Sequence, residues 1–259
     1  MSTAVYVPAR PRPLLRPIAL PTEHGGWGFL IEPILLAMLV APSRAGALVA
    51  LAYTFGFLTR QPLRFALQDA RRGRAYPRTR WCWLFAAAYA AAALLALAAA
   101  ISLRGWTIII PIGLVAPMGL TQILYDAHNR SRSLLPELAG AAAMCSSAAA
   151  IGIAVGMRIV PALALSGIVI ARAIPSIVYV RTVLGHTKPK WIALALHAAA
   201  IALVALFAPM MAVVAMALLF VRAAWGLSHP PPRAQQVGWT EIVFGLVTVL
   251  LAAAPHLVR

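Results

Sequence analysis

The amino-acid sequence predicts an all-α fold, a polytopic transmembrane bundle of about nine helices with a cytoplasmic N-terminus. Of the 259 residues, 62% are hydrophobic and 11% are charged, whereas about a quarter of the residues in a typical soluble domain are charged. The apolar residues form long runs, and the basic residues gather in alternate connections between them. A helical bundle embedded in a bilayer is the fold class that accounts for these observations.

The apolar runs set the number of helices. A helix that crosses a bilayer needs roughly 20 mainly apolar residues, and nine stretches meet or approach that length. Only Ala208 and Pro209 separate the seventh stretch from the eighth, so they must join in a tight hairpin, and a count of eight helices is the alternative. The nine stretches are 25–41, 45–59, 81–102, 105–125, 135–156, 159–180, 191–208, 210–227 and 237–255.

The placement of basic residues orients this bundle. With the N-terminus inside, 18 of the 22 lysines and arginines fall on the cytoplasmic side, including the connection 60–80. Such a bias is typical of cytoplasmic loops, and it disfavours nucleic-acid binding, which needs a basic soluble face. We expect a flexible basic tail over 1–20 and one transmembrane domain over 21–259. The four outward cations are Arg44, Arg104, Arg158 and Arg259.

The six acidic residues all lie on or near the cytoplasmic side of this topology. Glu32 sits about two turns inside the first helix, where a carboxylate is costly and usually faces a cavity. The two cysteines, Cys82 and Cys145, fall in apolar runs with no disulfide or metal spacing, which favours a packing role.

The first polar motif leads into the first helix. It reads PTEHGGWG over 21–28 and contains Glu23 and His24. An acid near a helix N-terminus stabilises the helix, and Trp27 suits an interfacial anchor. These structural roles compete with a binding role for Glu23, His24 and Glu32.

The second motif is the arginine-rich segment 60–80, in which seven arginines accompany one acid, Asp69. A loop that only orients the protein and touches lipid head groups is one interpretation. The other is an anion site, because guanidinium groups bind phosphate in a bidentate manner. Arg60 and Arg64 are one helical turn apart, and with Arg72 they are the candidate ligands.

The third motif, YDAHNRSR over 125–132, is followed by Glu137. Ion pairs within this loop are one possibility. The alternative is a site in which Arg130 and Arg132 face an anionic substrate, while Asp126 or Glu137 holds a metal ion or a proton. The candidate site residues in this segment are Tyr125, Asp126, Arg130, Arg132 and Glu137.

The fourth motif surrounds Arg172, which lies within an apolar helix and needs a partner or an aqueous cavity. No acid occurs between Glu137 and Glu241, so the partner must come from another helix, with Glu32 or Glu137 as candidates. Arg181 follows near the end of the same helix as a further candidate ligand. A lone His197 is more often a packing residue than a ligand. The alanine-rich runs 86–100, 139–150 and 211–224 are predicted helix-packing surfaces.

With these motifs in view, the sequence resembles the YwiC-like family of bacterial membrane proteins. The matching segments are PTEHGGW at 21–27, RQPLRFALQDARRGRAYPRTR at 60–80 and RSRSLLPELAGA at 130–141. The resemblance implies a multi-pass protein of the bacterial cytoplasmic (inner) membrane and implies little about activity.

The chain is also loosely similar to the UbiA-type intramembrane prenyltransferases, which place polar motifs after helices two, four and six. Tyr125 to Arg130 resemble the segment that binds diphosphate in that superfamily, and Asp69 lies where its first aspartate-rich motif falls. That superfamily holds Mg²⁺ with several aspartates in each of two loops. Here the first loop has one aspartate and the loop after helix six has none, which argues against a two-metal mechanism.

Three function classes are therefore open. The leading hypothesis is a transferase-like enzyme that acts on an isoprenoid or lipid diphosphate, in which arginines bind the anion and Asp69 and Asp126, with Glu137, hold Mg²⁺ or transfer protons. It predicts that Arg130→Ala abolishes activity without affecting membrane insertion. The alternatives are a small-anion transporter that uses Glu32, Arg172 and His197, and a non-catalytic assembly factor.

Overall fold

The computed structural model of the chain describes residues 15–21, 24–186, 189–230 and 233–257, and of His24 and Gly25 it describes only the backbone. Over these residues the chain forms nine helices of 15 residues or more, together with the single turn α1 and the short 3₁₀ turn η1. The elements are α1 (Arg16–Ala19), α2 (His24–Val40), α3 (Arg44–Arg71), α4 (Thr79–Arg104), η1 (Trp106–Ile108), α5 (Ile109–Ala127), α6 (Leu134–Val155), α7 (Ile159–Val183), α8 (Trp191–Ala205), α9 (Met210–Ser228) and α10 (Ala234–Leu257).

The nine long helices coincide with the nine predicted stretches, which confirms the all-α prediction and favours nine helices over eight. The hairpin between the seventh and eighth stretches is formed by residues 206–209, between α8 and α9. The second stretch is the exception. It was expected to end near residue 59, but α3 continues through Pro62 to Arg71, so the first half of the predicted loop 60–80 is helical.

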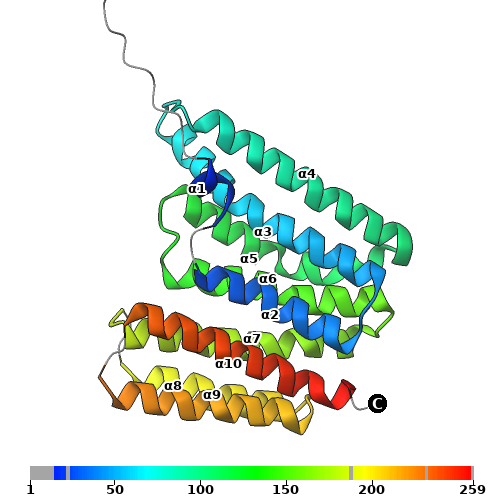
Figure 1. Cartoon of the computed structure of the whole chain (residues 1–259), viewed down its shortest axis with the longest axis vertical. Coiled ribbons are helices and arrows are strands. Elements are labelled where there is room, and N and C mark those ends of the chain that lie inside the picture. The colour runs from blue at the N-terminus through cyan, green and yellow to red at the C-terminus, as the bar shows by residue number, and fades with distance from the viewer. Residues whose placement is uncertain (1–14, 22–23, 187–188, 231–232, 258–259) are drawn as a thin grey trace, which may run out of the picture.

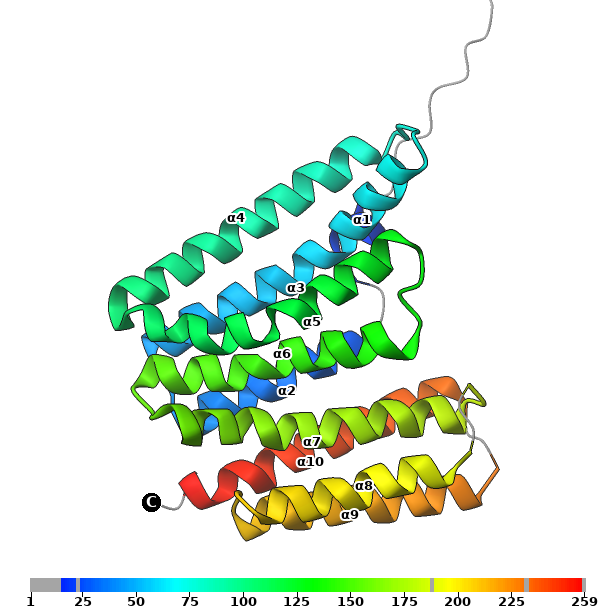
Figure 2. The same ribbon diagram turned by 180° about the vertical axis from the view of Figure 1, so that it is seen from behind.

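The helices lie side by side and run alternately in opposite directions, so their ends meet at two opposite edges of the molecule (Figures 1 and 2). One edge holds the starts of α2, α4, α6, α8 and α10 and the ends of α3, α5, α7 and α9. We call it the basic end, because it holds the arginine-rich connections; it is on the left in Figure 1.

Six helices of the described chain are long and apolar enough to cross a bilayer: α4, α5 with η1, α6, α7, α9 and α10. The apolar helices α2 and α8 are shorter. Leu95 on α4 and Leu206 after α8 are 71% and 82% exposed, as expected for side chains that face lipid rather than water. The molecule is a membrane-spanning helical protein.

Helix α6 forms the centre of the bundle. The alanine-rich run 139–150 is buried along most of its length, which confirms the predicted packing surface, because small side chains allow neighbouring helices to approach closely. The run 86–100 in α4 differs, since only Ala86, Ala96 and Ala100 are buried there. Helix α4 lies at the edge of the molecule, beside α3 (Figure 1), and turns most of its alanines outward.

Exposed tryptophans lie at both ends of the bundle. Trp81, Trp191, Trp225 and Trp239 are exposed and lie within two turns of the helix ends at the basic end. Trp106 is 74% exposed at the opposite end. Exposed indole rings at both levels match the aromatic belts of membrane proteins, which places the bilayer between them.

Candidate functional site

A cavity of about 790 Å³ lies among helices α2, α3, α5, α6, α7 and α10. Most of its lining residues come from the halves of these helices nearest the basic end, such as the starts of α2 and α10, and those of α3 come from its middle. Apolar side chains such as Phe29, Phe57 and Ile242 make up much of the wall. The charged lining residues are Glu32, Arg60, Arg132, Glu137, Arg172, Arg181 and Glu241.

Three charged residues line the deep part of the cavity: Glu32 of α2, Arg172 of α7 and Glu241 of α10. Together with Arg222 of α9, which contacts Glu241, they form what we call the buried charge network. Arg172 Nε lies 3.0 Å from Glu32 Oε2, and Arg172 Nη2 lies 3.7 Å from Glu241 Oε2. Arg222 Nη1 lies 2.7 Å from Glu241 Oε1. Two cations thus balance two anions across four helices. Of the two candidate partners that the sequence offered for Arg172, Glu32 is in contact with it, and Glu137 pairs with Arg181 instead.

Local packing fixes the positions of these four side chains. Arg172 Nη2 donates a hydrogen bond to the backbone oxygen of Glu241, at 2.8 Å. The Arg222 guanidinium lies over the ring of Tyr179, 4.1 Å from its centroid, where a cation is attracted to the aromatic face. Gly245 of α10 faces the Glu32 carboxylate so closely that a Cβ atom there would overlap it. The glycine therefore provides the space for the ion pair.

The rim of the cavity, nearer the basic end, carries a second set of charges. Arg181 Nη1 lies 2.9 Å from Glu137 Oε2 and donates a hydrogen bond to the backbone oxygen of Arg132, at 3.0 Å. These contacts join α6 to the end of α7. The Arg132 side chain is exposed and lines the cavity, and its guanidinium has no partner among the described residues. The exposed His186 lines the same rim.

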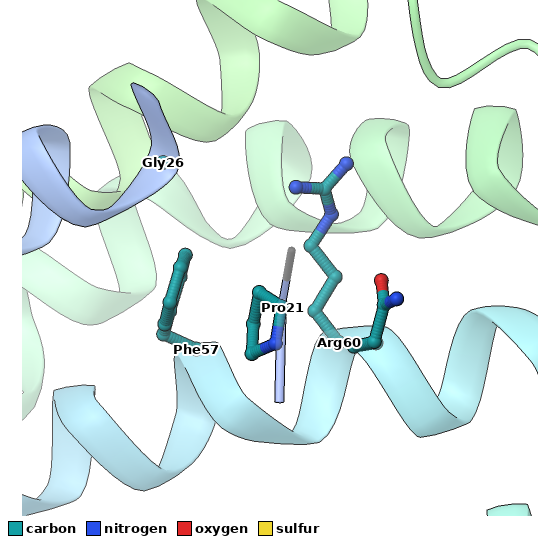
Figure 3. Close-up of a pocket in the computed structure, with 5 residues that line it drawn as sticks. Pro21, Gly26, Phe57 and Arg60 are labelled. Atoms are coloured by element: carbon teal, nitrogen blue, oxygen red, sulfur yellow. The ribbon is translucent and has the colours of Figure 1, made fainter. Parts of the chain in front are cut away.

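Arg60 stands at the α3 side of the cavity. Its guanidinium makes a bidentate contact with Asp126 of α5, at 2.7 and 3.2 Å. Figure 3 shows Arg60 beside Pro21, Gly26 and Phe57 at a separate small hollow. That hollow measures about 10 Å³, which is room for about one water molecule, so the large cavity is the candidate ligand site.

Asp69 forms a different structure, outside the cavity lining. Its carboxylate accepts hydrogen bonds from Arg78, at 2.8 and 3.2 Å, and from Thr79 Oγ1, at 2.8 Å. Burial alone would raise the pKa of this carboxyl, but the hydrogen bonds from Arg78 and Thr79 outweigh burial and hold the pKa below its ordinary value. We call this contact between the end of α3 and the start of α4 the Asp69 staple.

The predicted site residues thus separate into two groups. Glu32, Arg60, Arg132, Glu137, Arg172 and Arg181 meet at the cavity. Of the others, Arg72 and Arg130 are exposed, and Arg64 and Tyr125 are half-buried. His24 begins α2, although its side chain is not among those described, and Glu23 lies outside the described residues. These others do not line the cavity as far as the structure describes it.

Ion pairing within the loop after α5 was one possibility left open by the sequence, and it is wrong for the described residues. Asp126 pairs with Arg60 from α3, and Glu137 pairs with Arg181 from α7. A helix end places a side chain beside neighbouring helices rather than beside its own loop, so the partners come from distant segments.

The metal-binding expectation for Asp69 and Asp126 receives no support from their surroundings. Both carboxylates are buried and engaged by arginine, and the described part of the chain contains no group of three or more His, Cys, Asp or Glu side chains suited to a metal ion. Mg²⁺ prefers oxygen ligands in octahedral geometry, and arginine neighbours compete with it for the same carboxylates.

Two members of the buried charge network were not predicted as site residues. Glu241 lies seven residues into α10 and Arg222 six residues before the end of α9, so each sits about 10 Å from the basic end at 1.5 Å of rise per residue. Their depth within apolar helices was the available signal, because charges at membrane depth are rare and need partners.

Comparisons with known proteins agree with the resemblance found in the sequence. A family model described as YwiC-like protein matches residues 20–152, a little over half of the chain and the part that carries α2 to α5 and most of α6. No curated protein and no solved structure matches the chain significantly. The looser similarity to UbiA-type enzymes therefore stays a prediction.

Proposed function

Because the chain belongs to the YwiC-like family and folds as a membrane-spanning helical bundle, we propose that it binds an amphiphile with an anionic head in the cavity at its basic end. By the distribution of basic residues, this end faces the cytoplasm. The membrane is then the cytoplasmic membrane of a bacterium.

The position of Arg132 is the observation that carries the proposal. Its guanidinium lies at the cavity rim and has no acidic partner in the described part of the chain, whereas the neighbouring Arg181 is held by Glu137. A guanidinium offers five N–H donors in a planar fork that matches phosphate or carboxylate oxygens. A ligand anion at the rim would give Arg132 the partner that it lacks.

The rest of the cavity suits the apolar part of such a ligand. A volume of about 790 Å³ falls within the range of ordinary small-molecule sites, roughly 300 to 1,000 Å³. Phe29, Phe57 and Ile242 supply an apolar wall beyond the charged rim. An isoprenoid or acyl chain attached to a phosphate or diphosphate combines the two kinds of surface that the cavity offers.

Transfer of a group from the bound amphiphile would be a further step, and the proposal assigns no metal ion to it. Asp69 lies outside the cavity lining and Asp126 is engaged by Arg60, so the residues present do not form a Mg²⁺ site of the two-metal kind. Mg²⁺ bound together with a diphosphate ligand remains a prediction from the sequence, and its effect is measured directly in the experiment below.

The proposal is tested by native mass spectrometry of the detergent-purified protein titrated with decyl phosphate and with a prenyl diphosphate, with and without Mg²⁺. We expect saturable binding of one ligand by the wild-type protein. Arg132→Ala should weaken binding by about tenfold or more, because a charge-assisted hydrogen bond contributes roughly 1.5–3 kcal/mol. Arg130→Ala is the matched control, since Arg130 is an exposed arginine of the same loop that does not line the cavity.

Equal weakening in Arg130→Ala and Arg132→Ala would show a general effect of loop charge and contradict the site. The absence of binding by the wild-type protein would contradict the proposal and direct attention to transport or assembly. Transport has less support, because the cavity is lined mostly by the halves of the helices nearest one end, and no lining residue among those described comes from the opposite end.

A further inference from the structure

We infer that the amphiphile carries a second polar group, a neutral hydrogen-bond donor such as a hydroxyl, at the end remote from its anion, and that Glu32 accepts the hydrogen bond. This inference rests on the proposed function, since it names the class of molecule that the same cavity selects. The anion binds at the rim, the apolar chain crosses the middle of the cavity, and the donor reaches the buried charge network.

The unsatisfied carboxylate of Glu32 is the first observation. Glu32 is 7% exposed and lines the cavity, yet neither of its oxygens accepts a hydrogen bond from the part of the chain that the structure describes. Arg172 compensates its charge at 3.0 Å, although Arg172 Nε is not aligned to donate a hydrogen bond. A buried carboxylate normally accepts several hydrogen bonds, so this acceptor is open to a ligand.

The described residues around Glu32 do not supply the missing donor. Arg172 directs its Nη2 donor to the backbone oxygen of Glu241. Gly28 and Gly245 face Glu32 Oε1, since a Cβ atom added at either position would meet this oxygen, and glycine has no side chain that could donate. The carboxylate is therefore accommodated by the fold but left open toward the cavity.

The length of the cavity sets the length of the ligand. Arg172 and Arg181 both line it and lie nine residues apart on α7, which corresponds to about 13 Å along the helix axis. Between them, Ile177 and Val180 present apolar side chains to the cavity. Two polar regions separated by an apolar wall match a molecule with polar groups at both ends of an apolar chain.

The charge of the deep region favours a neutral donor over an ammonium group. Glu32 and Glu241 are balanced by Arg172 and Arg222 within the network. A charged group placed there would add an uncompensated charge at membrane depth, which is costly. A hydroxyl satisfies the Glu32 carboxylate and leaves the balance of charge unchanged.

The test compares the binding of decyl phosphate and 10-hydroxydecyl phosphate, which differ only in the terminal hydroxyl, by native mass spectrometry. We expect the hydroxyl to strengthen binding to the wild-type protein by about tenfold, the effect of one hydrogen bond to a charged acceptor. The shorter 6-hydroxyhexyl phosphate should gain nothing from its hydroxyl relative to hexyl phosphate, because it does not span the two regions.

Two variants test whether the gain in binding from the hydroxyl depends on Glu32. The double substitution Glu32→Met with Arg172→Met removes both charges of the pair together, which buried ion pairs tolerate better than the loss of one partner. Gly28→Ala keeps the pair and places a methyl group 3.3 Å from Glu32 Oε1, where it obstructs the approach of a ligand. The advantage of the hydroxyl should disappear in both variants, while decyl phosphate still binds.

Each other result has a definite meaning. Equal binding of the two decyl probes to the wild-type protein overturns the inference and leaves the proposed anion site intact. An advantage of the hydroxyl that survives in both variants also overturns it, because the donor then binds elsewhere. Failure of both probes to bind contradicts the proposed function itself.

Discussion

Arg172 lies eleven residues before the end of α7, which is about 16 Å from the basic end at the rise of an α-helix. A full charge at that depth is tolerated because Glu32 and Glu241 surround it and because Arg222 balances the second carboxylate. Removing one of these charged side chains therefore lowers the free energy of unfolding by more than any single contact contributes, since the remaining charge is left uncompensated.

Single and double substitutions test this balance. Arg172→Met should destabilise the protein by about 3–5 kcal/mol, because Glu32 then remains buried without a counter-charge. The double variant with Glu32→Met should recover most of that loss. Unfolding in mild detergent measures both free energies, and equal destabilisation by the single and double variants would contradict the pairing.

Gly245 gives a second test at this scale. Gly245→Ala places a Cβ atom on the Glu32 carboxylate and against Arg172 Nη2, so the ion pair must separate or α10 must move. We expect a loss of about 2 kcal/mol or more, within the range of overpacking. Gly238→Ala on the same helix has open space around it and should be neutral or slightly stabilising, since alanine favours helix formation.

The sequence predicted part of this network and not the rest. The candidate partners of Arg172 could be narrowed to Glu32 or Glu137 because the chain has only six acids, and the structure selects Glu32. Glu241 and Arg222 were not predicted as site residues, since the order of residues along the chain does not show that α9 and α10 bring them beside α7. Pairing between helices depends on tertiary packing, which one sequence does not specify.

At the scale of elements, α3 shows how a helix can extend past an apolar run. Its first half is apolar, and its second half carries Arg60, Pro62 and Arg64. Proline and charge predicted a loop, because proline removes one backbone hydrogen bond and disfavours a helix interior. The helix continues because Arg60 is held by Asp126 and because Ala66 packs with Ile18 and Cys82 at its end. These tertiary contacts outweigh the local preference.

The Asp69 staple closes the connection between α3 and α4, and its strength depends on pH. The folded-state pKa of Asp69 is lowered, so its contribution is complete above the unfolded value of about 3.9 and is lost as pH falls through the folded pKa. Asp69→Asn should cost about 1 kcal/mol at neutral pH, an amount reduced by the partial exposure of Arg78.

Unfolding measured from neutral pH to about pH 3 checks this expectation. The difference between the wild-type protein and Asp69→Asn should shrink as the pH falls below the unfolded pKa of Asp69 toward its lowered folded pKa. Arg74→Gln is the control, because it removes an exposed arginine of the same connection that makes no side-chain contact among the described residues. The difference in stability between this variant and the wild-type protein should not depend on pH. A difference for Asp69→Asn that is constant across the pH range would contradict the role of the ionised carboxylate.

For the whole molecule, the basic residues and the cavity identify the same end as the polar face. The basic residues gather at the end where the cavity opens, and exposed tryptophans mark both edges of the apolar band. Helix number and helix positions could be predicted from the sequence because apolar length acts locally on each segment. The cavity could not, since its wall combines residues from six helices. Orientation stays a prediction from the charge bias.

Orientation is tested by labelling single introduced cysteines in cells with a membrane-impermeant maleimide. Ala75→Cys, in the connection after α3, should react only after the membrane is opened, and Arg158→Cys, before α7, should react in intact cells. The native Cys82 and Cys145 are buried and should react slowly. The reverse pattern of labelling would place the cavity on the outer side.

The most direct test of the central claim, that the cavity at the basic end binds an anionic amphiphile, is to fill the cavity and measure decyl phosphate binding by native mass spectrometry. Gly119 of α5 lines the cavity and has open space where a side chain would extend. Gly113, on the same helix, has equally open space but does not line the cavity. We predict that Gly119→Leu abolishes binding, while Gly113→Leu binds like the wild-type protein; equal binding by both variants would contradict the account.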